Sequence, residues 1–106
     1  MRIRTFFAIA AMGMSATVAY AQDAMTEHQA AMETMMSSMH GMTSSGDPDM
    51  DFTMMMIPHH QSAIDMARVQ LKYGKDPALR ALAGKVISDQ KREIAEMKAW
   101  QAAHGR

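Results

Sequence analysis

The sequence contains no cysteine, so neither a disulfide framework nor a thiolate metal site is available to this protein. Leucine, isoleucine and valine are all missing between Gln22 and Met56, a segment in which ten methionines occur. Thioether sulfur is both apolar and a ligand for soft metal ions, Cu(I) above all. The segment leads into Met54-Met55-Met56-Ile57-Pro58-His59-His60, which adds two imidazoles to the thioethers.

An apolar run long enough to span a bilayer is also missing. The longest run, Phe6 to Val18, follows Arg2 and Arg4 and ends at Ala19-Tyr20-Ala21, small residues at the spacing that a signal peptidase accepts. We predict that residues 1–21 are a signal peptide, that residues 22–106 form a single methionine-rich helical domain, and that the protein is exported without a permanent membrane anchor.

An excess of basic residues is absent as well. Without residues 1–21, nine lysines and arginines face eleven aspartates and glutamates, a formal charge of 9 − 11 = −2. This charge balance indicates no basic surface of the kind that binds nucleic acid. A domain of this size has a modest core, which a metal ion or oligomerisation could reinforce.

Hydrophobic periodicity predicts three helices and no strand. A stripe with helical spacing begins the domain and comprises Met25, His28, Met32, Met35, Met39 and Met42. Asp47-Pro48 predicts the start of a second helix, which ends near Gly74, and Asp76-Pro77 predicts the start of a third helix through Trp100. We therefore expect an all-α antiparallel bundle of three helices per mature chain, with dimerisation as a way to complete it.

Pro58 interrupts the second helical pattern. It removes one backbone donor beside His59 and His60, so we expect either a kink there or a helix that begins at Pro58 itself. Helical phase places His60 towards the core and His59 on the flank. Counting residues from the turn near Gly74 places Gln90 opposite His59, where its amide could orient an imidazole or satisfy the free carbonyl of Met54.

The same count about the first turn brings Met32, Met35 and Met36 to the level of Met55 to His59, with His28 about a turn further along. Three helices are thus expected to deliver soft donors to one layer. The predicted metal ligands from the residues themselves are His59, His60, Met55, Met56, His28, Met32, Met35 and Met36.

The strings Met56-Ile57-Pro58-His59-His60-Gln61, Met66-Ala67, and Gln90 with Glu93 and Met97 resemble a family of exported helical proteins with copper-binding, CopM-like members. The resemblance covers about residues 50–101. It implies a ferritin-like helical bundle in the periplasm that binds Cu(I) or Ag(I) in resistance or homeostasis. Carried over residue by residue, it implies His59, His60, Met66 and Met97 as ligands, with Gln90 and Glu93 as supporting residues.

The leading hypothesis is a non-enzymatic protein that sequesters Cu(I) or silver, or transfers the ion to a partner protein. The alternative is a non-catalytic helical interaction module whose adaptable methionine-rich face binds a protein partner or a second subunit. A ferritin-like oxidase is disfavoured because the sequence has no Glu-x-x-His or His-Glu-x-x-His pattern.

Overall fold

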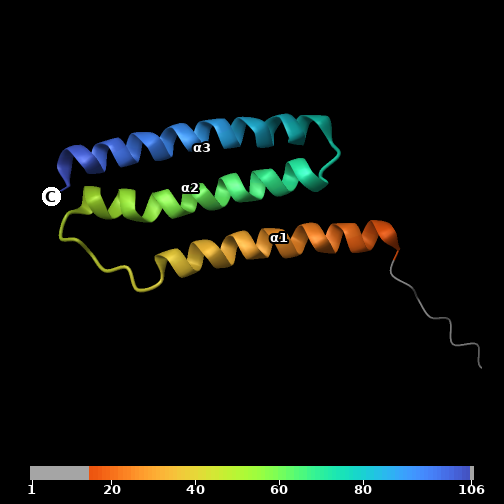
Figure 1. Cartoon of the computed structure of the whole chain (residues 1–106), viewed down its shortest axis with the longest axis horizontal. Coiled ribbons are helices and arrows are strands. Elements are labelled where there is room, and N and C mark those ends of the chain that lie inside the picture. The colour runs from red at the N-terminus through yellow and green to blue at the C-terminus, as the bar shows by residue number, and fades with distance from the viewer. Residues whose placement is uncertain (1–14, 106) are drawn as a thin grey trace, which may run out of the picture.

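Three antiparallel α-helices make up the fold in the computed structural model, which describes residues 15–105 (Figure 1). They are α1 (Ala16–Met39), α2 (Pro48–Tyr73) and α3 (Pro77–His104). No strand occurs within residues 15–105, so the predicted all-α class is confirmed. None of these helices is apolar enough over a sufficient length to cross a membrane.

Aspartate caps explain where α2 and α3 begin. The Asp47 side chain accepts a hydrogen bond from the backbone N–H of Asp49, and Asp76 accepts one from the backbone N–H of Leu79. In both helices a proline follows at the first helical position, where its missing N–H costs nothing. The two Asp-Pro pairs therefore set the helix starts, as the sequence predicted.

The first helix differs from the prediction at both ends. It starts at Ala16, nine residues before Met25 (25 − 16 = 9), and ends at Met39, so Met42 lies in the following loop. Ala19, Tyr20 and Ala21, at the predicted cleavage point, are part of α1, and residues 1–14 of the predicted signal peptide lie outside the described residues. Helix α2 passes through Pro58 without a break, so the alternative helix start at Pro58 is wrong.

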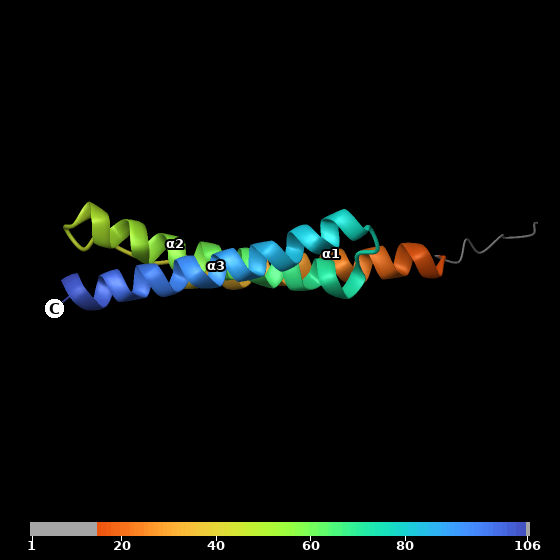
Figure 2. The same ribbon diagram turned by 90° about the horizontal axis from the view of Figure 1, so that it is seen from above.

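The helices form a single layer with α2 in the middle (Figure 1). Helices α1 and α3 each pack against α2 and make no contact with each other. Seen edge-on, the three helices share one narrow band, and the Cα trace measures only 13 Å along its shortest axis (Figure 2). Both broad faces of α2 are therefore left uncovered by the other two helices.

Two small sets of side chains hold the layer together. Ser62 and Val69 are buried on the side of α2 that faces α1, and Thr53, Ile64 and Ala67 are buried towards α3. Ile64 is the one large side chain among the described residues with less than 2% of its surface exposed. A core this thin agrees with the modest core expected from the chain length.

Polar contacts tie α1 to the end of α2. The Tyr20 hydroxyl donates to the carbonyl of Lys72 over 3.1 Å, and the Tyr20 ring packs edge-on against Tyr73. About two turns further along α1, the Lys72 side chain donates to Glu27 over 2.8 Å, which lowers the pKa of Glu27 and raises the pKa of Lys72. These contacts fix the antiparallel register of α1 on α2.

Candidate metal centre

The two adjacent histidines of the motif have different surroundings. His59 is exposed, whereas the His60 side chain retains 16% of its surface and lies in the groove between α2 and α3. Its Nε2 lies 2.6 Å from a carboxylate oxygen of Glu93 on α3. An ionised carboxylate only accepts, so the imidazole Nε2–H is the donor.

This hydrogen bond occupies Nε2 and leaves Nδ1 as the nitrogen open to another ligand. In a neutral imidazole with its proton on Nε2, Nδ1 carries a lone pair, and the Nδ1 of His60 is buried without any hydrogen-bond partner. A buried acceptor without a partner costs free energy, so a vacant one calls for an explanation. Metal-bound histidines have this arrangement: one nitrogen donates to a carboxylate and the other ligates the ion.

The register of α2 and α3 places two thioethers beside this imidazole. Met56 precedes His60 by one turn and Met97 follows Glu93 by one turn, so antiparallel packing brings Met56 and Met97 to the same level. A second cross-helix hydrogen bond fixes this register, because Gln101 donates to the Thr53 hydroxyl over 2.8 Å. Both methionines are half-buried. The thioethers of Met56 and Met97 thus lie at one level of the groove, one helical turn from His60.

The supporting residues were predicted only in part. Glu93, which the resemblance implied, makes the hydrogen bond to His60. Gln90 was expected to bond an imidazole or the carbonyl of Met54; it is half-buried, and the structure gives it neither bond. Counting residues from the turn near Gly74 had placed Gln90 opposite His59. In the structure His60 pairs with Glu93, which lies about one turn beyond Gln90 along α3.

The remaining predicted ligands lie elsewhere on the layer. At 100° per residue, most of them share one broad face, which we call the methionine face. It carries His28, Met32, Met36, Met55, His59 and Met66. Met35 is half-buried and lies closer to α2. On this face Met66 lines an apolar groove with Leu82 and Val86, whereas Met36 borders a shallow hollow with His40.

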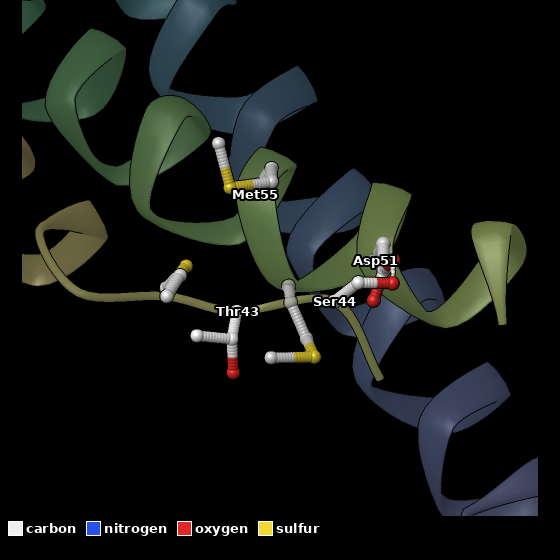
Figure 3. Close-up of a pocket in the computed structure, with 6 residues that line it drawn as sticks. Thr43, Ser44, Asp51 and Met55 are labelled. Atoms are coloured by element: carbon white, nitrogen blue, oxygen red, sulfur yellow. Dashed lines mark hydrogen bonds between the residues drawn. The ribbon is translucent and has the colours of Figure 1, made fainter. Parts of the chain in front are cut away.

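A cavity at the α1–α2 turn gathers thioethers that the prediction did not place together. Met42, Met54 and Met55 line a space of about 190 Å³, with Thr43, Ser44 and Asp51 completing its wall (Figure 3). Met42 and Met54 were absent from the predicted ligand set: Met42 was predicted to lie on the first helix, and Met54 was given no place on a helix face. The signal that could have found them is the loop of five polar and glycine residues, 43–47, which folds Met42 back onto α2.

Asp51 holds that loop in place. It accepts hydrogen bonds from Ser44 Oγ at 2.6 Å, from Ser45 Oγ at 2.7 Å and from the Ser45 backbone N–H at 2.8 Å. The bond from Ser44, then those from Ser45, keep the pKa of the Asp51 carboxyl below its ordinary value. Figure 3 shows Ser44 and Asp51 next to each other where the loop passes the first turns of α2. The wall of the cavity is therefore anionic and preorganised.

Carboxylates and imidazoles alone do not form a metal cluster here. Among the described residues, no three His, Asp or Glu side chains come close enough together to hold an ion. A site that also includes methionine sulfur favours soft monovalent ions over hard divalent ones. This donor set also argues against the carboxylate-rich di-iron centre of ferritin-like oxidases.

A protein-family model matches most of the chain. The model of a family described as Domain of unknown function (DUF305) matches residues 9–101. The chain belongs to the DUF305 family. The match extends well beyond the segment of about residues 50–101 on which the resemblance rested, and it includes the whole of α1. No curated protein matches the chain. The family description assigns no activity, so function is argued from the donor groups.

Proposed function

We propose that this DUF305 protein binds Cu(I), with Ag(I) as a second soft ion, and that it is an exported, periplasmic protein of CopM-like type rather than an enzyme. It sequesters the ion or passes it to a partner protein. The observation that carries the proposal is the buried Nδ1 of His60, which has no partner while Glu93 holds Nε2.

Three neutral donors fit the ion. The imidazole Nδ1 of His60 and the thioethers of Met56 and Met97 are the residues that would hold it, and soft neutral ligands of this kind suit Cu(I). Glu93 orients the ring and offsets the charge of the complex, as carboxylates do behind metal-bound histidines. Half-burial of the three side chains leaves the site open to a partner, which suits transfer of the ion.

A competition titration tests the ligands. The chain is titrated anaerobically with Cu(I) against a chromophoric Cu(I) chelator, alongside the double variant Met56→Leu/Met97→Leu and His60→Ala. Methionine and leucine have similar volumes, so the fold should tolerate the exchange. We expect each variant to bind at least tenfold more weakly, and X-ray absorption of the loaded protein to report both sulfur and nitrogen neighbours.

Met25→Leu is the matched control, since Met25 is an exposed thioether of α1 outside the proposed set. Wild-type affinity in both His60→Ala and the double variant would exclude this site. The interaction-module hypothesis predicts a different result, in which thermal unfolding of the wild-type chain ignores added Cu(I). Binding to the native state alone must instead raise the unfolding temperature.

A further inference from the structure

The two broad faces of the helix layer differ in charge. Helical phase places Arg68 and Lys72 of α2 and Arg80 and Lys98 of α3 on the face opposite the methionine face. On the methionine face the basic side chains are Lys85 and Arg92, which lie at its α3 edge and are paired with Asp89 and Glu96. The two faces thus differ in their basic side chains, although the opposite face also has an apolar groove, lined in part by Met54, Ile57 and Ile94.

Large apolar side chains are exposed on the methionine face. Phe52 is 60% exposed, Met36 64%, Leu82 54% and Met32 48%, and helical phase places all four on this side. Two grooves between α2 and α3 open there. One, of about 310 Å³, is lined by Met66, Leu82 and Val86, and the other, of about 430 Å³, by Phe52, Met97 and Trp100. A contiguous apolar surface of this extent marks an interaction site.

We infer that the methionine face is the interface between two copies of this chain, packed layer on layer. Without the predicted signal peptide, α1 keeps residues 22–39 (39 − 22 + 1 = 18), so the face measures about 27 Å along α1 and about 25 Å across the three helices. The resulting area of about 700 Å² lies within the range of roughly 600 to 1,000 Å² per partner that standard-size protein interfaces bury. Stacking two layers also gives each α2 the cover that its own chain lacks.

The chemistry of the face favours a second copy over other occupants. A two-fold contact requires a surface that is complementary to itself, and this surface has two grooves whose walls include the exposed side chains of Phe52 and Leu82. The acids of the face are Asp89, Glu93 and Glu96 on α3 and Asp49 at the start of α2, whereas its α1 part carries methionines and His28. Setting α1 of one copy over α3 of the other therefore keeps the α3 carboxylates apart. A lipid surface is disfavoured because these carboxylates outnumber the basic side chains at the edge of the face, whereas interfacial helices are rich in lysine or arginine.

The second copy also closes the candidate metal centre. Met97 lines a groove that opens on the methionine face, so the partner layer covers the open side of the His60 site. This consequence rests on the proposed function, whereas dimerisation itself needs no copper. The two are therefore tested separately, with no metal present in the test of the interface.

Analytical ultracentrifugation of the metal-free chain, from about 1 to 200 µM, measures the association. Leu82→Glu places a charge on the methionine face at a position already 54% exposed, and Gln61→Glu places the same charge at an exposed position of the opposite face. We expect wild type and Gln61→Glu to sediment as dimers and Leu82→Glu as a monomer with unchanged helicity.

Because the chain has no cysteine, a single thiol reports each face directly. Leu82→Cys should react with a maleimide at least tenfold more slowly in the dimer than at dilutions where the chain is monomeric, while Gln61→Cys should react equally fast in both. A monomeric wild type at 200 µM, a dimer that survives Leu82→Glu, or a monomer that instead binds phosphatidylcholine vesicles through this face would each overturn the inference.

Discussion

His60 and His59 are neighbours in the chain, yet they have opposite environments. His60 lies in the α2–α3 groove with Glu93 on one nitrogen and nothing on the other, while His59 is exposed on the methionine face. The difference follows from the 100° that separates consecutive helical residues, which places one imidazole towards α3 and the other beside it. The His-His motif does not distinguish the two residues, whereas the packing of α2 on α3 buries the Nδ1 of His60 and leaves His59 exposed.

Among single-residue changes, Glu93→Gln tests the role of the carboxylate behind His60 most directly. The amide oxygen can still accept from Nε2–H, but it lacks the negative charge that strengthens the bond and raises the basicity of the imidazole. We expect Cu(I) affinity to fall about 10- to 100-fold with the helical content unchanged. The measurement is a chelator competition, with Glu96→Gln as the control because Glu96 is exposed and lies one turn away from the pair. Equal losses in both variants would show a general charge effect.

The thioether cavity yields a separate residue-scale prediction. Met42, Met54 and Met55 line one cavity beside the Asp51 carboxylate, so we expect a chain that binds Cu(I) as proposed to hold a further ion here. Native mass spectrometry of the loaded chain should show one ion fewer for Met42→Leu/Met54→Leu than for wild type. Met25→Leu should retain the wild-type count. An unchanged count in the double variant would mean that the cavity holds no ion.

At the scale of elements, the loop between α1 and α2 depends on a single carboxylate. Asp51 lies in the first turn of α2 and accepts three hydrogen bonds from Ser44 and Ser45, while Gly46 adopts a left-handed backbone with φ of 87°. Glycine takes that conformation without the steric cost that a side chain brings. The turn is thus specified by short-range polar groups rather than by apolar packing.

This turn should respond to acid. The folded-state pKa of Asp51 is lowered, so its contribution to stability is complete above the unfolded value of about 3.9 and is lost as the pH falls through the lower folded value. We expect amide exchange at Ser45, measured by NMR and corrected for the intrinsic pH dependence of exchange, to lose protection in that acidic window. In Asp51→Asn protection should already be lower at neutral pH. A flat, corrected profile in wild type would contradict this assignment.

Helix starts were predictable because their signals are local. Asp47-Pro48 and Asp76-Pro77 combine a capping side chain with a proline that cannot extend a helix backwards, and both helices begin at those prolines. The start of α1 was not found, because residues 16–21 had been assigned to the signal peptide. The packing of Tyr20 against α2 depends on Lys72 and Tyr73, about fifty residues away. No local pattern encodes such a contact.

For the whole molecule, the layer arrangement has a thermodynamic consequence. Among residues 15–105 Ile64 is the one large side chain that is fully buried, so little apolar burial offsets the conformational entropy lost on folding. Phe52 and Leu82 remain exposed, and their burial by association would add stability. We expect the unfolding temperature of the metal-free chain to rise with protein concentration, because association stabilises the folded form by mass action. Calorimetry over a hundredfold range measures it, with Leu82→Glu as the variant whose unfolding temperature stays constant.

Three helices, their antiparallel order and the abundance of thioether ligands could be predicted from the residues alone, because capping, hydrophobic period and ligand type are properties of short segments. Helix packing was needed to show that α1 and α3 do not contact each other and that His60 bonds Glu93 rather than Gln90. Packing was also needed to show that Met42 and Met54 line one cavity. Those outcomes depend on helix register, and sliding one helix past another by one turn changes every partner without changing the pattern of any single helix.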